Sequence, residues 1–423
     1  MADQKTMTEA SDPTASVAAD LADERLIRTQ GAAGYARLFV NRLKSGELGS
    51  LPVVVGLVVI SLAFYSAEPK FLSSYSIVSI TQFAAPIGVI ALGIVLVLLL
   101  GEIDLSVGSV SGFASAVMAV LLVNKGQSIV VAILAALAVG LAIGAVYAVL
   151  YTKLGVPSFV FSLAGLLGFQ GALLFVLGTQ GTINIPSQSG LLQFARRSFV
   201  PDTVSYILVV AIVALYAATQ VWGVRRRTAA ELSSPPLALT AVKALLMLVG
   251  LLALTYYVNI DRGWSYLWVF FVVLVVLMDL ALRRTTWGRH VFAVGGNEEA
   301  ARRSGIKVDR VYFSVFALTS TLAALGGVLA VGLQTSVSQA SGTTDTNLTA
   351  IAAAVIGGTS LFGGRGSAYS AMLGILVLQA IQSGLNLINV DSSVRFMVTG
   401  AVLLLAVAID SVSRRARASS GRG

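Results

Sequence analysis

Long apolar runs separated by short polar segments dominate the chain from residue 51 onward. A helix that crosses the hydrocarbon core of a bilayer needs about 20 consecutive apolar residues. The run 346–362 is the shortest and is also compatible with a re-entrant or broken helix. The pattern predicts an all-α, polytopic membrane fold of about twelve spans, within a range of roughly ten to fourteen. The predicted spans are 51–68, 78–100, 105–123, 128–150, 158–178, 204–222, 240–258, 265–282, 311–334, 346–362, 367–388 and 394–412. Together they form one transmembrane domain, 51–412.

The first fifty residues depart from this pattern. They contain no early apolar core, so we do not interpret them as a cleavable signal peptide. Residues 1–20 are rich in Ala, Ser, Thr and Asp, which is typical of disorder. Four apolar side chains further on share one helical face, as in a helix lying on the inner leaflet: Tyr35, Leu38, Phe39 and Leu43. A poorly ordered tail is the alternative.

Composition supports the membrane interpretation. Only 12% of the 423 residues are charged and 56% are hydrophobic, with a mean hydropathy of +0.86. Soluble proteins carry roughly 25% charged residues. The chain has no cysteine, which excludes disulfides and thiol-ligated metals, and its single histidine, His290, excludes a multi-histidine metal site.

Lys and Arg are distributed unevenly between the polar segments. With the N-terminus inside, one side of the membrane holds 23 of the 29 basic residues and the other holds 6. Cytoplasmic loops carry the excess of Lys and Arg, so both termini, including the basic tail 413–423, are predicted to be cytoplasmic. The same bias accounts for the net charge of +9 without a nucleic-acid partner. The six residues on the opposite side are Lys70, Lys125, Arg196, Arg197, Arg262 and Arg395.

Two glycine-rich segments repeat each other at an offset of 256 residues: "GEIDLSVGSVSG" (101–112) and "GGTSLFGGRGSA" (357–368). Gly, Leu and Gly coincide in the two segments, and each segment lies between two apolar runs. Transporters are often built from internal repeats with broken helices at corresponding places. The echo therefore indicates an internal repeat, although glycine-rich membrane sequence also recurs by chance.

The polar loop 283–310 contains a short stretch with the features of a helix. Asn297 is a good N-cap, and Glu298 and Glu299 suit the positive end of a helix dipole. Arg302 and Arg303 lie four residues after these glutamates, in the favourable order for ion pairs. Gly305 provides a stop, and Ala300 and Ala301 leave a small centre for close docking. An ordinary positively charged loop is the alternative.

Four stretches together resemble the permease subunits of ATP-binding-cassette importers for monosaccharides. They are "GEIDLSVGSV" (101–110), "VPSFVFSLAG" (156–165), "GGNEEAARRSGI" (295–306) and "AIAAAVIGGTSLFGGRGS" (350–367). The extra spans within 204–282, with "VNIDRGW" (258–264), are similar to the longer xylose-type permeases. Phe362 and Arg365 stand where this family usually has smaller residues, and their role is open.

The resemblance implies a bacterial inner-membrane protein that works as a pair of permeases. Two ATPase subunits would bind ATP and Mg²⁺ on the cytoplasmic side, and a periplasmic sugar-binding protein would deliver the sugar. This chain would then need no cofactor of its own, and it contains no GxxxxGK[ST] phosphate loop. The resemblance implies that the ATPase is contacted through Asn297, Glu298, Glu299, Ala300, Ala301, Arg302, Ser304 and Gly305.

Neutral amides mark a candidate translocation path. Gln379, Gln382 and Asn386 share one face of the predicted helix 367–388, and amides both donate and accept hydrogen bonds to sugar hydroxyls. Hydrogen bonds between helices explain the same stripe equally well. Asp104 borders an apolar run, where we expect it to cap a broken helix, with direct contact to sugar as the alternative. Thr359 and Ser360 complete the candidates for the path.

Two other classes of protein also fit a chain with many spans. A secondary transporter of the major-facilitator kind would more often show buried carboxylates or a proton relay, and few ionisable groups lie at the span centres here. A membrane-embedded enzyme would need a converging nucleophile, base or metal site, and the sequence shows none. The sequence does not identify the sugar.

Overall fold

The computed structural model describes residues 51–229, 237–402, 404 and 408. The predicted features of the tails 1–50 and 413–423 therefore lie outside the described residues. The chain divides into two compact units. In the described part, the smaller unit covers 206–229 and 237–253, and the larger unit covers 51–205 and the described residues from 254 onward.

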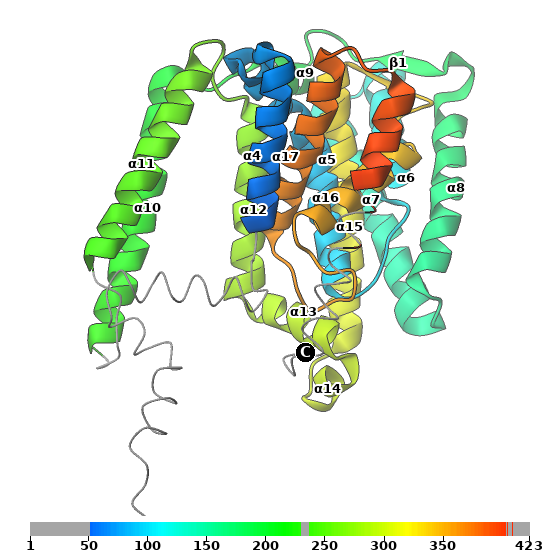
Figure 1. The fold of residues 1–423 in the computed structure, drawn as a ribbon. Coiled ribbons are helices and arrows are strands. Elements are labelled where there is room, and N and C mark those ends of the chain that lie inside the picture. The colour runs from blue at the N-terminus through cyan, green and yellow to red at the C-terminus, as the bar shows by residue number, and fades with distance from the viewer. Residues whose placement is uncertain (1–50, 230–236, 403, 405–407, 409–423) are drawn as a thin grey trace, which may run out of the picture. The chain divides into compact units, whose positions relative to one another are not determined.

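Helices make up almost all of the larger unit (Figure 1). Nine helices in the described part of the chain are long and apolar enough to cross a membrane. Seven of the nine lie mainly in the larger unit: α5 (Ser74–Leu99), α6 with η2 (Val107–Asn124), α7 (Ile129–Leu154), α8 (Ser158–Leu177), α12 (Tyr266–Arg284), α15 (Val308–Gln334) and α17 (Ala368–Leu387). Two shorter apolar helices, α4 (Leu51–Ala67) and α16 (Thr344–Ile356), accompany them, and residues 392–402 are also helical. The all-α polytopic class is confirmed, whereas the number of twelve spans stays a prediction.

Helices α5 and α15 form the centre of the larger unit. The most apolar stretch of α5 is 89% buried within the protein, and that of α15 is 78% buried. Small residues bring the helices close, because a side chain at Gly144 of α7 would collide with the backbone of Phe316 in α15, at 2.5 Å from its carbonyl oxygen. Close backbone approach at small residues is the usual way in which helices associate in a membrane.

Two α-helices of the larger unit are about two-thirds as long as a membrane span: α16, and α6 without its π-helical continuation η2. Both α6 (Val107–Ala119) and α16 have 13 residues, or about 20 Å at 1.5 Å per residue. We predicted 346–362 as one run, but α16 ends at Ile356. The chain turns there because Gly358 adopts a left-handed conformation with φ +103°. A short helix that ends here agrees with the expectation of a broken helix in the run 346–362, whereas re-entry into the membrane stays a prediction.

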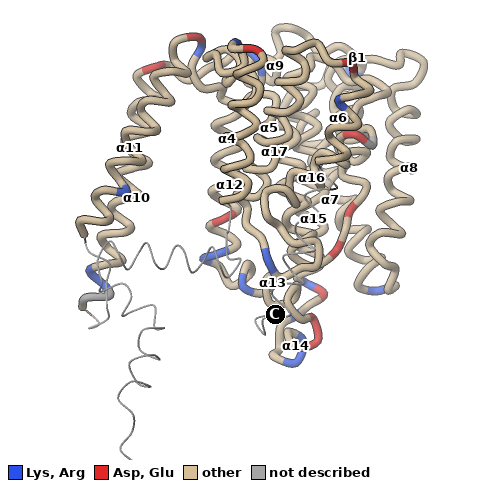
Figure 2. The backbone as a smooth tube through the Cα atoms, in the orientation of Figure 1, with Lys and Arg blue, Asp and Glu red and all other residues tan. Residues whose placement is uncertain are grey.

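The two ends of the larger unit differ in character. Charged residues lie mainly towards these ends of the chain trace (Figure 2). One end carries the short helices α13 (Thr286–Gly296) and α14 (Glu298–Arg303), and we call it the α14 end. The other end carries α9 (Gly190–Leu192), the π-helical turn η4 (Gln193–Arg197) and a small antiparallel sheet of β1 (Thr182–Asn184) and β2 (Ser336–Ser338), and we call it the β1 end (Figure 1).

The smaller unit is built from two apolar helices, α10 (Asp202–Ala229) and α11 (Leu237–Asn259). The first residues of α10 and the last residues of α11 belong to the larger unit. They correspond to the predicted spans 204–222 and 240–258. Most of their apolar side chains are exposed, as expected of helices that face lipid.

Candidate functional site

The charged stretch at the α14 end folds as the sequence predicts. The side chain of Asn297 accepts a hydrogen bond from the backbone N–H of Ala300 at 2.9 Å, so it caps the helix. Gly305 ends the helix with φ +86°, a conformation that glycine adopts at little cost. Both predicted ion pairs form, with N–O distances of 2.8 and 3.1 Å: Arg302 with Glu298, and Arg303 with Glu299.

The two alanines at the centre of α14 point in different directions. Ala301 is only 4% exposed and packs into the main hydrophobic core, whereas Ala300 is on the surface. Ser304 turns its hydroxyl back to the carbonyl oxygen of Ala301 at 2.8 Å. We expected both alanines to form the docking surface, but only Ala300 presents its side chain there, because α14 packs one face against its own protein.

Three chain segments meet in close backbone contact beside α14. Gly364, in the loop after α16, donates its N–H to the carbonyl oxygen of Leu99 at the end of α5, at 2.9 Å. A Cβ atom at Gly295, near the end of α13, would lie 1.7 Å from the same oxygen. A Cβ atom at Gly363 would lie 2.6 Å from the carbonyl oxygen of Gly295. We call these four residues the glycine junction. The two repeated segments found in the sequence, 101–112 and 357–368, also meet here, because a Cβ atom at Gly363 would lie 3.0 Å from the backbone nitrogen of Gly101.

Asp104 lies in the loop between α5 and α6 and is 1% exposed. Its Oδ1 accepts hydrogen bonds from the backbone N–H of Ser106 at 2.8 Å and from its hydroxyl at 2.7 Å. Because Ser106 directly precedes the first residue of α6, these bonds hold the loop and do not cap a free amide of the helix, so the predicted cap stays a prediction. Burial raises the pKa of the Asp104 carboxyl, and the two hydrogen bonds from Ser106 oppose this rise. Its Oδ2 atom is buried without a hydrogen-bond partner. The position of Asp104 at the border of an apolar run did not indicate that its carboxyl group is buried inside the protein.

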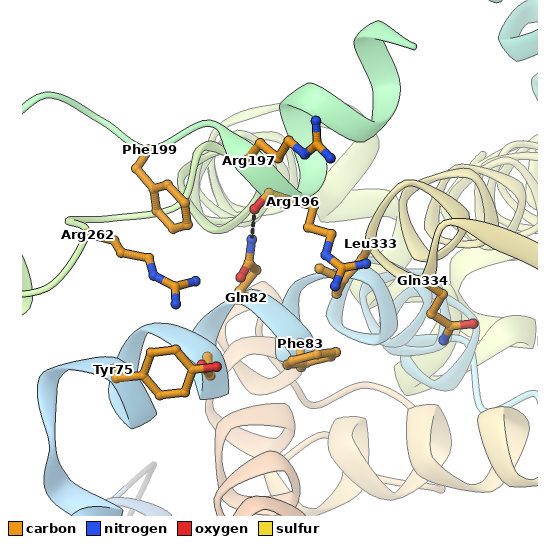
Figure 3. Close-up of a pocket in the computed structure, with 10 residues that line it drawn as sticks. Tyr75, Gln82, Phe83, Arg196, Arg197, Phe199, Arg262, Leu333 and Gln334 are labelled. Atoms are coloured by element: carbon orange, nitrogen blue, oxygen red, sulfur yellow. Dashed lines mark hydrogen bonds between the residues drawn. The ribbon is translucent and has the colours of Figure 1, made fainter. Parts of the chain in front are cut away.

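A cavity of about 620 Å³ opens at the β1 end (Figure 3). Of the ten residues that line it, three are arginines and none is acidic. Arg196 and Arg197 come from η4, which is held by Gln82 of α5: its amide donates to the carbonyl oxygens of Ala195 at 2.9 Å and Arg196 at 3.3 Å. Because Gln82 is only 6% exposed, it fixes the turn from inside the protein.

Aromatic rings hold the third arginine. The guanidinium of Arg262 lies 4.7 Å from the ring centre of Tyr75 and 5.9 Å from that of Phe199. Such cation–π contacts orient an arginine without neutralising it. Asp261 also pairs with this guanidinium at 3.3 Å. The cavity therefore combines fixed positive charge, aromatic faces and neutral amides.

A second, smaller cavity of about 100 Å³ adjoins the first through Gln334 of α15, which lines both. It lies between α5, α6, α15 and the segment 340–346. Hydroxyls of Ser111, Ser115 and Ser341 line it together with small or apolar residues. A hydroxyl-rich molecule could exchange hydrogen bonds with this lining, because serine both donates and accepts.

Comparison with known proteins identifies the type of molecule that contains these cavities. Residues 76–407 match the family described as branched-chain amino acid transport system, permease component. The chain is 33% identical to the xylose transport system permease protein of Escherichia coli K12 over 376 residues, covering 88% of this chain and 94% of that protein. Identity to the Haemophilus influenzae protein of the same name is 34% over 382 residues, covering 88% and 99%. The ribose import permease protein of Bacillus subtilis is 31% identical, covering 86% and 94%. No solved structure matches the chain.

The chain belongs to this permease family. It is a multi-pass protein of the cytoplasmic membrane, and as a permease component it is a transport subunit that works with separate components. Membership also decides against a major-facilitator transporter.

The residues predicted for the permease's path do not line either cavity. Gln379 is mostly buried and donates to Ser383 of its own helix at 3.3 Å, and Asn386, at the exposed end of α17, accepts from Arg395. Gln382 is half-buried on the same helix. Their common helical face is confirmed, while their role in the path stays a prediction.

Thr359 and Ser360, the other predicted path residues, lie in the loop after α16 near the glycine junction. Thr359 is 1% exposed, and its hydroxyl is buried without a hydrogen-bond partner. Ser360 donates its N–H to the carbonyl oxygen of Arg365 at 2.9 Å, and its hydroxyl accepts from the N–H of Phe362 at 3.2 Å. Phe362 and Arg365 thus stabilise this loop through hydrogen bonds of their backbone atoms.

The arginine-lined cavity was missed in the sequence, although a signal was present. Only six of the 29 basic residues fall on the sparsely charged side, and three of those six line this one cavity. The positive-inside bias makes arginines on that side unusual. Three arginines on this side could therefore have indicated a site. The contact between η4 and Gln82 of α5, which forms the cavity wall, could not be predicted from the sequence.

Proposed function

We propose that this permease imports a monosaccharide, with xylose as the first candidate, using ATP hydrolysed by a separate ATPase subunit. The observation that carries the proposal is the pair of adjoining cavities, lined by amides, hydroxyls and aromatic rings, in a chain similar to xylose and ribose permeases. Aromatic faces suit the apolar face of a sugar ring, and amides and hydroxyls suit its hydroxyl groups.

The α14 end is proposed to face the cytoplasm and bind the ATPase. The supporting observations are the charge split and an exposed, capped helix with an exposed small residue at its centre. The β1 end would then face the periplasm, where the arginine-lined cavity would receive sugar from a binding protein. ATPases of this class act in pairs, and one permease offers one α14, so we propose a two-fold dimer of permeases in the lipid membrane.

Reconstitution tests this function directly. Proteoliposomes containing the permease, its ATPase and its binding protein should accumulate radiolabelled xylose only when ATP is supplied inside. Ribose and fructose are the comparison sugars. Uptake driven by the permease alone, or no uptake of any of the three sugars by the assembled complex, would contradict the proposal.

A cysteine at Lys307 tests the orientation. Lys307 is exposed in the loop after α14, and the natural chain has no cysteine to interfere. The Lys307→Cys variant should react with a membrane-impermeant thiol reagent in inverted vesicles and not in intact cells. Serving as the matched control, Lys125→Cys, exposed in the turn before α7, should show the opposite pattern. Labelling of Lys307→Cys from outside would refute the orientation.

Two leucine substitutions discriminate between the two candidate paths. Gln334→Leu removes the amide shared by both cavities, and Gln379→Leu removes the buried amide of the α17 stripe. An unsatisfied sugar hydroxyl costs about 1–3 kcal/mol, so the variant on the true path should lower uptake about five- to hundredfold. We expect the loss at Gln334. A loss confined to Gln379→Leu would instead assign the path to α17.

A further inference from the structure

Two tyrosines whose rings are in contact connect α14 with the break between α5 and α6. The hydroxyl of Tyr312, on α15, donates to the Glu298 carboxylate of α14 at 3.3 Å. The hydroxyl of Tyr151, on α7, donates to the carboxylate of Glu102 at 2.6 Å. The rings of the two tyrosines lie 4.4 Å apart between their centres, with a tilt of 37°. The consecutive helices α14 and α15 are thus joined to α7 and to the loop after α5, which are distant in the sequence, in one chain of contacts.

The chain of contacts ends in the loop 100–106, which α7 holds at two points. Tyr147 lies one helical turn before Tyr151 and donates its hydroxyl to the hydroxyl of Ser106 at 2.9 Å. Tyr151 holds Glu102 near the start of the loop, and Tyr147 holds Ser106 near its end. The buried Asp104 lies between them and bonds Ser106. Any displacement of this face of α7 therefore reaches both sides of the helix break.

The tyrosine pair sits in rigid surroundings. Phe316, one turn after Tyr312, lies 5.7 Å from the ring centre of Tyr151 and 6.3 Å from that of Tyr312. The helices beneath it, α7 and α15, are in backbone contact at Gly144. Packed interiors shift between discrete arrangements and do not deform continuously, so a rigid cluster can transmit a small movement.

The hydrogen bonds at the two ends of the pair differ in length. Each tyrosine donates to a carboxylate, and charge-assisted hydrogen bonds are shorter and stronger than neutral ones. The hydroxyl of Tyr151 lies 2.6 Å from the carboxylate of Glu102, within the range of a strong hydrogen bond to a carboxylate, whereas that of Tyr312 lies 3.3 Å from Glu298, which is longer than that range. Glu298 is held in turn by its ion pair with Arg302. A displacement of α14 therefore acts on Tyr312 and Tyr151 through hydrogen bonds as well as through apolar packing.

We infer that Tyr151 and Tyr312 are positioning residues that carry movement of α14 to the loop 100–106, and so link ATPase engagement to the helix break. This inference rests on the proposed function, in which α14 binds the ATPase. It assigns to the two hydroxyls a role in coupling in addition to any role in stability.

Removing each hydroxyl tests the link. Tyr151→Phe and Tyr312→Phe keep the rings and lose the bonds to the carboxylates. Tyr257→Phe is the matched control, because its hydroxyl donates to the carbonyl oxygen of Leu72 at 2.9 Å, at the β1 end. The measurement is the factor by which sugar-loaded binding protein stimulates ATP hydrolysis in the reconstituted complex. Coupling between sites typically corresponds to 5- to 150-fold, so each test variant should lower this factor about fivefold or more, and the control should not.

A double-mutant cycle identifies the pathway. Glu298→Gln alters the surface end of the chain of contacts and leaves the core untouched. If the link is correct, adding Glu298→Gln to Tyr312→Phe lowers the factor little further, because residues that share one interaction are non-additive. A purely structural role would lower the thermal unfolding temperature of the tyrosine variants and leave the stimulation factor unchanged.

A spectroscopic measurement follows the loop itself. A nitroxide attached to Leu105→Cys, in an otherwise cysteine-free chain, should change its spectrum when ATP is added to the complex, and this change should disappear in Tyr151→Phe. Wild-type stimulation factors in both tyrosine variants, or an equal loss in Tyr257→Phe, would overturn the link alone. Absence of ATP-driven uptake in the wild-type complex would overturn the proposed function, and the link with it.

Discussion

Replacing Ala300 by tryptophan is expected to reduce ATP-driven sugar uptake at least tenfold while the permease still inserts and folds. Ala300 is the exposed small residue at the centre of α14, held in place by the Asn297 cap. The cores of interfaces pack as densely as protein interiors, so an indole at the centre of the contact leaves the partner no room. A tenfold loss corresponds to only about 1.4 kcal/mol of binding energy, so this estimate is conservative. Co-purification of the ATPase and uptake in proteoliposomes measure the effect.

Two further tryptophan variants serve as controls for an indole at another surface position and at a buried position. Ala67→Trp changes an exposed alanine at the end of α4, next to the short helix η1 (Pro69–Leu72) that precedes α5, and should leave uptake unchanged. Ala301→Trp should lower the amount of folded protein, because Ala301 is 4% exposed and overpacking a core costs typically 1–3 kcal/mol. Normal ATPase binding and uptake in Ala300→Trp would mean that the ATPase contacts another surface.

The features of α14 that could be predicted from sequence are those that depend on near neighbours. The Asn297 cap, the two ion pairs and the left-handed Gly305 each involve residues no more than four positions apart. The division between Ala300 and Ala301 could not be predicted, because it depends on how α14 packs against the rest of the protein. Helical periodicity over two turns is too short to identify a buried face.

The helix breaks were predicted less well than the helices. Apolar length located the long spans within a few residues, because the bilayer sets a similar length for all of them. It could not show that α16 stops at Ile356, since the apolar run continues beyond it and the turn is set by the left-handed Gly358. Nor could it show that the segments 101–112 and 357–368, recognised as an echo, are in contact.

The candidate path illustrates the same limit. Amide spacing correctly placed Gln379, Gln382 and Asn386 on one helical face, but spacing cannot tell whether such a face meets a cavity, a neighbouring helix or solvent. Gln82 and Gln334 are single amides within apolar runs, and no sequence pattern distinguishes them. Gln82 fixes the turn η4, and Gln334 lines both cavities. Both roles depend on segments more than a hundred residues away in the sequence.

Adding one methyl group at Gly295 is expected to disturb both stability and coupling. In the Gly295→Ala variant the new Cβ would lie 1.7 Å from the carbonyl oxygen of Leu99, and no side-chain rotation relieves that contact because both atoms are fixed to backbone. The oxygen already accepts the N–H of Gly364, so separating the segments also sacrifices this bond, which is worth about 1 kcal/mol. With an overpacking cost of roughly 1–3 kcal/mol, the thermal unfolding temperature should fall by several degrees and uptake should be largely lost.

The next residue provides a matched control for this prediction. Gly296 follows Gly295 as the last residue of α13, but a Cβ atom there would meet nothing within 4 Å. Gly296→Ala should therefore be neutral or slightly stabilising, since alanine is favoured over glycine in a helix by up to about 1 kcal/mol. Thermal unfolding in detergent and uptake in proteoliposomes should separate the two variants clearly. If Gly295→Ala and Gly296→Ala unfold at the same temperature and transport equally well, then α13, α5 and the loop after α16 are not in contact at Leu99. In that case the glycine junction could not hold these three segments together at the α14 end.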